Sequence, residues 1–121
     1  MDLNQKGVGD AMLTMASGRI DLSNADDFTT ALSAALTRSK TALILDLSKV
    51  DYISSAGLRS LMITLKASKA ENKGFGVAAL QPMLAEIFSI ARLNQVVPIF
   101  QTTREAVAKL APDALAQFDA D

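Results

Sequence analysis

The chain has 121 residues, half of them hydrophobic and about a fifth charged, which is the composition of one globular domain with a real core. It contains no Cys and no His, which excludes thiolate nucleophiles, disulfides, cysteine-type zinc sites and imidazole bases. The 12 basic and 13 acidic residues nearly cancel and form no basic stripe, so we expect no nucleic-acid partner. No signal peptide and no apolar run of roughly 20 residues is present, which favours a cytoplasmic protein without a membrane partner.

The first half of the chain predicts a hairpin, a helix and a buried strand. Gly9-Asp10 is a dipeptide typical of a tight hairpin turn, and apolar runs flank it. Ser23 offers an N-cap for a helix whose apolar residues recur at helical spacing from Phe28 onward. The strands expected here are residues 3–8, 11–16 and 42–47, the last ending in polar residues and a short loop.

The second half predicts three more helices and two more strands. One helix begins near Ser55, Pro82 suits the first turn of the next, and Thr102 with Glu105 forms a capping box for the last. Pro98 indicates an edge position for the final strand. The strands expected between these helices are residues 74–80 and 96–100.

The element order is therefore β-β-α-β-α-β-α-β-α. Alternating strands and helices predict right-handed crossovers, hence one α/β domain with a mixed, mostly parallel sheet of about five strands and four helices. Pro112 is expected to end the last helix, so we place the domain at residues 1–111 and a C-terminal tail at residues 112–121. In open sheets of this class, function is expected at the carboxyl ends of the strands.

Two serines stand where the second helix begins, directly after the polar end of the third strand. Backbone N–H groups at a helix start have no partners inside the helix, and a phosphate there would meet these donors and the positive end of the helix dipole. Gly57 removes a side chain from the first turn, which would let a partner approach the backbone closely. On these residues alone, an ordinary N-cap at Ser54, with Ser55 filling the first turn, is the favoured interpretation, because serine is common before helices.

A resemblance to STAS domains, particularly to anti-sigma factor antagonists, is carried by residues 50–59 (VDYISSAGLR). Residues 18–21 (GRID) and 81–93 also resemble the family, so the likeness spans roughly residues 8–110. The family's phosphorylated serine lies two residues before the glycine, and that position is Ser55 here. Some relatives have Asp where this chain has Ser54, which makes Ser54 a secondary candidate for phosphorylation.

The resemblance implies a switch between two partners. The unphosphorylated form would bind a serine-kinase anti-sigma factor, phosphorylation of Ser55 would block that binding, and a metal-dependent serine phosphatase would reset the switch. The implied contact surface includes Asp21, expected beside the phosphorylation site, and the turn that starts the second helix. The residues of that turn are Ser54, Ser55, Ala56, Gly57, Leu58 and Arg59.

Two other classes of function stay open. The chain could be an accessory STAS subunit of another complex, such as a lipid transporter, in which the fold binds an ATPase without phosphorylation; Ser55 and Gly57 favour the switch instead. An enzyme is not expected, because no convincing acid/base pair is present. Asp46 and Asp51 could hold Mg²⁺ with a few waters, but such pairs near loops are more often solvated, so we expect neither metal nor cofactor.

Overall fold

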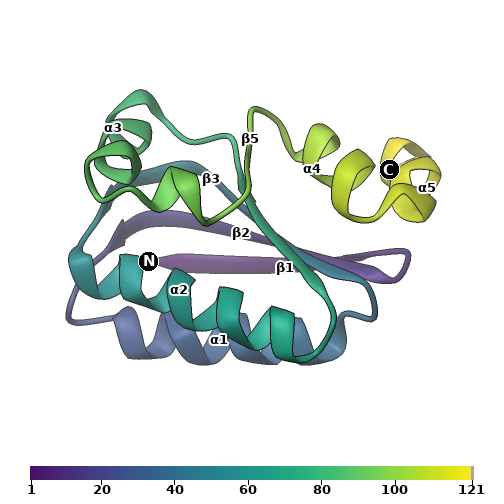
Figure 1. Cartoon of the computed structure of the whole chain (residues 1–121), viewed down its shortest axis with the longest axis horizontal. Coiled ribbons are helices and arrows are strands. Elements are labelled where there is room, and N and C mark those ends of the chain that lie inside the picture. Colours follow the sequence, from purple (N-terminus) through teal and green to yellow (C-terminus); the bar gives the residue numbers. More distant parts are fainter. Residues whose placement is uncertain (121) are drawn as a thin grey trace.

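Alternating strands and helices build a five-stranded sheet in the computed structural model, which describes residues 1–120 (Figure 1). The strands are β1 (Asp2–Val8), β2 (Ala11–Ile20), β3 (Ala42–Ile53), β4 (Gly74–Ala78) and β5 (Ile99–Phe100). They lie in the sheet in this order; β1 is antiparallel to β2, and every later pair is parallel. The α/β fold with a mixed, mostly parallel sheet is therefore confirmed.

Among residues 1–120 the structure has five α-helices, one more than the four predicted. They are α1 (Ala25–Arg38), α2 (Ser55–Ala70), α3 (Pro82–Ile90), α4 (Thr103–Leu110) and α5 (Leu115–Ala120), and two short 3-10 helices are η1 (Leu93–Gln95) and η2 (Pro112–Ala114). Pro112 does follow the end of α4, but proline also suits a first helical turn, and here it starts η2, which leads into α5. Within the described residues, none of the helices combines the length and apolarity needed to cross a membrane.

Different helices cover the two faces of the sheet. On one face α1, α2 and α3 contribute Phe28, Leu61 and Phe88 to the larger hydrophobic core, and α1 and α2 lie side by side (Figure 1). On the other face α4 contributes Ala106 and Val107 to a smaller core. Alternate residues of β3 enter the two cores, as the period of two in a strand requires. A sheet buried on both faces is the expected setting for parallel strands.

Strand β3 runs six residues past the end predicted for it, so the expected polar loop after Asp46 does not exist. The pairing of β3 with β2 shifts register twice, and at each shift β3 carries one extra residue. These β-bulges change the alternation, so that the buried residues become Leu47, Val50 and Ile53, three apart instead of two. Ser48 and Lys49 are exposed between them, which made the stretch read as a loop.

The hairpin at one edge of the sheet agrees with the prediction, whereas β5 at the other edge differs from it. Gly9 has a φ of +57° in the two-residue turn between β1 and β2, a backbone conformation that favours glycine. The last strand is shorter than the predicted residues 96–100, because η1 ends at Gln95, residues 96–98 only connect it to β5, and Ile99–Phe100 alone pairs with β4. Its place at the edge of the sheet agrees with the proline before it.

Residues 112–120, predicted as a tail, pack against the rest of the domain. Ala114 is buried in the smaller core, and a Cβ built on Gly9 would lie 3.1 Å from the Cβ of Ala114. On α5, Asp119 accepts hydrogen bonds from the guanidinium of Arg104 at 3.1 Å. Asp121, the last residue of the predicted tail, lies outside the described residues.

Candidate functional site

The chain passes from β3 into α2 at Ser54, which is fixed by three hydrogen bonds. Its N–H donates to the carbonyl of Ile20 at the end of β2 (2.8 Å), and its carbonyl accepts from the N–H of Leu58 (2.9 Å). Its side-chain Oγ accepts from the N–H of Gly57 (3.3 Å), so Ser54 is the N-cap of α2 as predicted. The half-buried hydroxyl of Ser54 is therefore engaged in the helix cap.

Ser55 is the first residue of α2, and its side chain is exposed. Within residues 1–120 the N–H groups of Ser55 and Ala56 have no acceptor, as expected in a first helical turn. The positive end of the dipole of a 16-residue helix lies at the same place. The site thus offers an accessible hydroxyl and two unpaired donors on a fixed backbone.

Gly57 has a different role from the one predicted. It is buried, and a Cβ built on it would lie 2.6 Å from Cγ1 of Ile53 and 2.8 Å from Cγ2 of Ile20. The space of the missing side chain is therefore filled by the ends of β2 and β3. Glycine lets the first turn of α2 pack directly on these two strands, and does not open the backbone to a partner.

Asp21 begins the loop between β2 and α1, directly after the residue whose carbonyl bonds to Ser54. Its carboxylate accepts hydrogen bonds from the hydroxyl and the N–H of Ser23, the latter at 3.0 Å. The hydroxyl of Ser23 lowers the pKa of Asp21, and the guanidinium of Arg19, 4.0 Å away, adds to the effect. Asp21 is thus an anion at the carboxyl end of β2, and α2 begins at the carboxyl end of the neighbouring strand β3.

The N-cap prediction for α1 was wrong by one residue: Asn24 is the N-cap, and Ser23 bonds to Asp21 instead. The side chain of Asn24 accepts from the N–H of Asp21 and donates to the carbonyl of Arg19, both at 2.9 Å. These bonds close the loop upon itself instead of capping the helix. Asn and Asp side chains commonly stabilise turns in this way.

Arg19 and Tyr52 form a contact that sequence reasoning missed. They are register partners in β2 and β3, and the guanidinium carbon lies 4.3 Å from the centre of the Tyr52 ring. This is within the range of a cation–π interaction. The contact depends on the register of β2 with β3, which only the structure reveals, because two bulges shift the pairing before Tyr52.

A groove between α1 and α2 was also missed. It has a cavity volume of about 380 Å³ and lies next to the turn, because Ala56 and Arg59 line it. The other lining residues are Leu22, Ala25, Asp26, Thr29, Ser60 and Ile63. The buried residues of α2 include Ser60, Thr64 and Ser68, each of which donates its hydroxyl to a carbonyl earlier in its own helix. Because these buried residues are polar, the spacing of apolar residues does not indicate that this side of α2 is buried.

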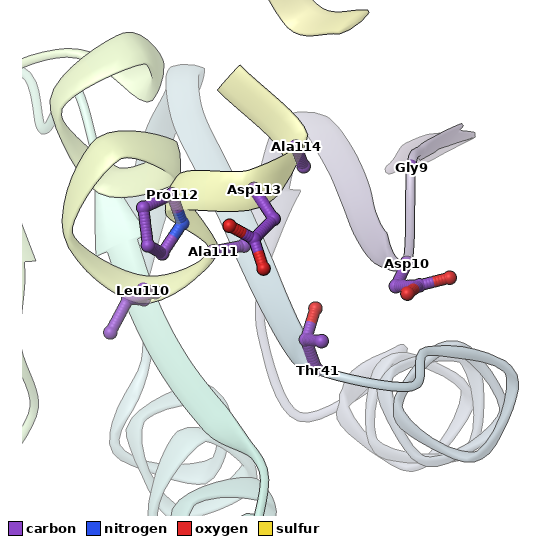
Figure 2. A pocket seen from close by; sticks show the side chains of 8 residues that line it. All are labelled: Gly9, Asp10, Thr41, Leu110, Ala111, Pro112, Asp113 and Ala114. Carbon is purple, nitrogen blue, oxygen red and sulfur yellow. The ribbon is translucent and has the colours of Figure 1, made fainter. Parts of the chain in front are cut away.

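A second cavity, of about 220 Å³, lies at the opposite end of the strands, between the hairpin turn and η2 (Figure 2). Asp113 and Thr41 point into it, whereas the carboxylate of Asp10 points outward (Figure 2). None of the predicted site residues lines it. The carboxylate of Asp46, weighed as a metal ligand, accepts a hydrogen bond from the N–H of Ser48 at 2.8 Å.

Comparison with known proteins gives consistent matches over nearly the whole chain. The model of the STAS domain family matches residues 2–106. BtrV of Bordetella bronchiseptica, assigned provisionally as an anti-sigma factor antagonist, is 28% identical over 115 residues, which are 95% of this chain and 98% of BtrV. An anti-sigma factor antagonist from Mycobacterium paratuberculosis has a TM-score of 0.82 at 28% identity, over 90% of this chain and 92% of that one. SpoIIAA, an anti-sigma factor antagonist solved in its unphosphorylated form, has a TM-score of 0.77 over 92% and 97% of the two chains; at 14% identity it shares the fold.

Proposed function

Since this chain belongs to the STAS domain family, we propose that it is an anti-sigma factor antagonist in a partner-switching circuit. Its unphosphorylated form binds a serine-kinase anti-sigma factor through the start of α2, and phosphorylation of Ser55 blocks that binding. A metal-dependent serine phosphatase removes the phosphate and resets the switch. The similarity to antagonists from Bordetella bronchiseptica and Mycobacterium paratuberculosis supports the general role, and SpoIIAA of Bacillus is a fold relative that has also been solved in a phosphorylated form.

The observation that carries the proposal is the contrast between two neighbouring serines. The hydroxyl of Ser55 is exposed at the first position of α2, whereas that of Ser54 is half-buried and accepts the N–H of Gly57. A kinase needs access to the oxygen that attacks the phosphate. Ser55 meets this requirement without disturbing the helix cap, and Ser54 would have to give up the cap. Ser55 is therefore the proposed phosphorylation site, with Ser54 as the secondary candidate.

Phosphorylation at this position is expected to leave the domain folded. A phosphate adds about −1.5 to −2 charges at neutral pH. The unpaired N–H groups of Ser55 and Ala56 and the helix dipole offset part of that charge, by roughly 0.3–1 kcal/mol at an exposed helix start. The three hydrogen bonds that fix Ser54 do not involve the Ser55 side chain. Phosphorylation therefore breaks none of the hydrogen bonds that hold the backbone of the turn, and we expect this backbone to keep its conformation.

The same charge opposes binding of a partner that fits a neutral hydroxyl. On docking, the phosphate must lose its bound water. It also lies at the carboxyl ends of the strands, where the carboxylate of Asp21 already places a negative charge. Phosphorylation can thus work as a local electrostatic block. A tenfold loss of affinity needs only about 1.4 kcal/mol, which is small compared with the cost of burying an unpaired charge.

Intact-mass measurement after incubation with the kinase and Mg-ATP tests the site. Wild type is expected to gain one phosphate, Ser55→Ala none, and Ser54→Ala one. Ser89→Ala, which alters an exposed serine on α3, is the matched control and should behave as wild type. Stoichiometric phosphorylation of Ser55→Ala would contradict the assignment and direct attention to Ser54.

Affinity and stability are then compared for the phosphorylated and unmodified proteins. Affinity for the kinase with bound nucleotide should fall at least tenfold, while the melting temperature changes little. A collapse of the fold on phosphorylation would refute the local mechanism. Unchanged affinity would refute the switch and favour a non-phosphorylated accessory subunit of another complex.

A further inference from the structure

Strand β1 (Asp2–Val8) forms one edge of the sheet and is open along its whole length. Within residues 1–120 its one neighbour in the sheet is β2, and the register of this pair runs without a bulge. The strand contains no proline, and every residue of it except Leu3 and Val8 is exposed. An edge of this kind presents a row of backbone donors and acceptors to which another strand can pair.

The backbone groups that face the open side follow from the geometry of the hairpin. In a two-residue hairpin the pair next to the turn is the hydrogen-bonded one, and such pairs alternate with non-hydrogen-bonded pairs along the ladder. Val8 is the residue of β1 next to the turn. The even-numbered residues of β1 therefore bond to β2, whereas the N–H and carbonyl groups of Leu3, Gln5 and Gly7 point to the open side.

The side chains of β1 alternate between the two faces of the sheet. Val8 enters the smaller core, so the even-numbered residues before it project on the same face. They are Asp2, Asn4 and Lys6, all of them exposed. The side chain of Gln5 lies on the other face, where its amide donates to a carbonyl of α1 at 3.5 Å. One face of the edge strand thus carries an acid and a base, with an amide midway between them.

From these observations we propose that two copies of this chain pair through β1, antiparallel and with the two-fold axis at Asn4, which joins their sheets into one of ten strands. In this register Leu3 of each copy exchanges backbone hydrogen bonds with Gln5 of the other. Asp2 of each copy lies opposite Lys6 of the other in a non-hydrogen-bonded pair, where side chains are closest. Opposite charges stabilise such pairs, and the symmetry provides two of them.

The charges on β1 also select this register. An axis at Lys6 would place the two lysines opposite each other, which is destabilising. An axis at Gln5 would place Asp2 opposite Val8, which is buried. An ammonium group carries three donors, so Lys6 can bind Asp2 of the second copy and keep a partner within its own chain. The register at Asn4 is therefore the one in which both charges of each edge meet opposite charges.

In the part of the chain that the structure describes, neither face of the sheet obstructs a second copy at β1. On one face α1 packs on β2 and β3. The α1 helices of two copies would lie at least three strand spacings apart, about 14 Å, which exceeds the roughly 10 Å between packed helices. On the other face η2 and α5 approach the hairpin at Gly9, beyond the residues that would pair. Asn4 lines an open hollow of about 250 Å³ on this face.

Sedimentation equilibrium between about 10 μM and about 1 mM protein tests the pairing. We expect wild type to pass from the 12.8 kDa monomer toward twice that mass. Asp2→Lys places lysine opposite lysine twice and should weaken the dimer at least tenfold (about 1.4 kcal/mol). Combining Asp2→Lys with Lys6→Asp exchanges the charges and should return the affinity to within about threefold of wild type. Glu86→Lys, which makes the same change of charge on the exposed side of α3, is the matched control and should dimerise as wild type.

A single cysteine tests the register, because the natural chain has none. In Asn4→Cys the two thiols face each other across the axis, with Cβ atoms about 4.5–5.5 Å apart, close to the separation that a disulfide spans. In Gln5→Cys they face Leu3 of the other copy instead. With oxidised glutathione, Asn4→Cys should form the covalent dimer about tenfold faster than Gln5→Cys.

The inference is overturned if wild type stays monomeric over the whole range of concentrations. It is also overturned if a dimer forms that Asp2→Lys does not weaken, or that Asn4→Cys cross-links no faster than Gln5→Cys. Either result would assign the contact to another surface. None of these outcomes bears on the proposed function, because antiparallel pairing through β1 directs the carboxyl ends of the parallel strands of the two copies away from each other and leaves both Ser55 side chains exposed.

Discussion

Replacing Gly57 by alanine should destabilise the domain, although alanine is the better helix former. The added Cβ would lie 2.6 Å from Ile53 Cγ1 and 2.8 Å from Ile20 Cγ2, closer than real Cβ contacts allow. Both isoleucines are buried and β-branched, so their side chains have few other rotamers to adopt. The helix must move away from the ends of β2 and β3, or one isoleucine must leave its preferred rotamer.

The magnitude follows from two opposing effects. Overpacking a core typically costs about 1–3 kcal/mol, and the higher helix propensity of alanine returns at most about 1 kcal/mol. Since both isoleucines are rigid, we take the middle of the overpacking range, about 2 kcal/mol, and after the gain from alanine the free energy of unfolding should fall by about 1–2 kcal/mol. With an unfolding entropy of about 2.1 cal/mol/K per residue, a chain of 121 residues should lose about 4–8 °C in melting temperature.

Thermal unfolding followed by circular dichroism measures this loss, and Gly7→Ala serves as the matched control. Gly7 lies in the exposed edge strand β1, and nothing is within 4 Å of a Cβ built on it. That variant should melt within about 2 °C of wild type, since surface changes usually stay within about 0.5 kcal/mol. A Gly57→Ala protein that melts at or above wild type would refute the close packing of α2 on the strand ends.

Three further predictions test other parts of the structure. Ser54→Ala removes the hydroxyl that caps α2, and should lower the free energy of unfolding in a urea titration by about 0.5–1 kcal/mol; no loss would mean that the 3.3 Å bond contributes nothing. The hydrogen bond from the Ser23 hydroxyl holds the pKa of Asp21 below its ordinary value of 3.8, so its stabilising effect is present above that pH and is lost as the pH falls through the folded-state pKa. Asp21→Asn should therefore flatten the fall in melting temperature below about pH 4, and an unchanged slope would contradict this reasoning. Deletion of residues 112–121 should lower the melting temperature, because it uncovers the smaller core that Ala114 completes; an equal melting temperature would identify the segment as an independent tail.

The order of the five strands and of the first four α-helices could be predicted because each of them carries a local signal. The hairpin follows from Gly9-Asp10, and the α2 start follows from two serines after a strand. The true length of β3 could not be predicted, because two bulges replace the period of two by a spacing of three. The bulges depend on how β3 pairs with β2, and the sequence of β3 alone does not determine that pairing.

The exposure of Ser55 at a helix start could be predicted, whereas the packing around it could not. A helix start after a strand places Ser55 at the surface, and the structure agrees. The sequence could not predict that Gly57 lies on the buried side of α2, since glycine has no side chain whose polarity would indicate a buried or an exposed position. The groove depends on Leu22 and Ile63 meeting across two elements. Contacts between residues of different elements depend on the tertiary structure. The buried polar residues Ser60, Thr64 and Ser68 also gave no apolar signal for the contact between α1 and α2.

The order of the strands in the sheet has a consequence for how the chain folds. Each of the five strands pairs with its immediate neighbour in the sequence, so no strand must be inserted between two already paired ones. The sheet can grow at one edge as the polypeptide leaves the ribosome, adding a strand and its crossover helix at a time. Short sequence separations between partners also favour rapid folding. The loop after β2 and the start of α2, which form the proposed contact surface, belong to elements that are all complete by Ala70, so this surface is synthesised well before the last strand is available.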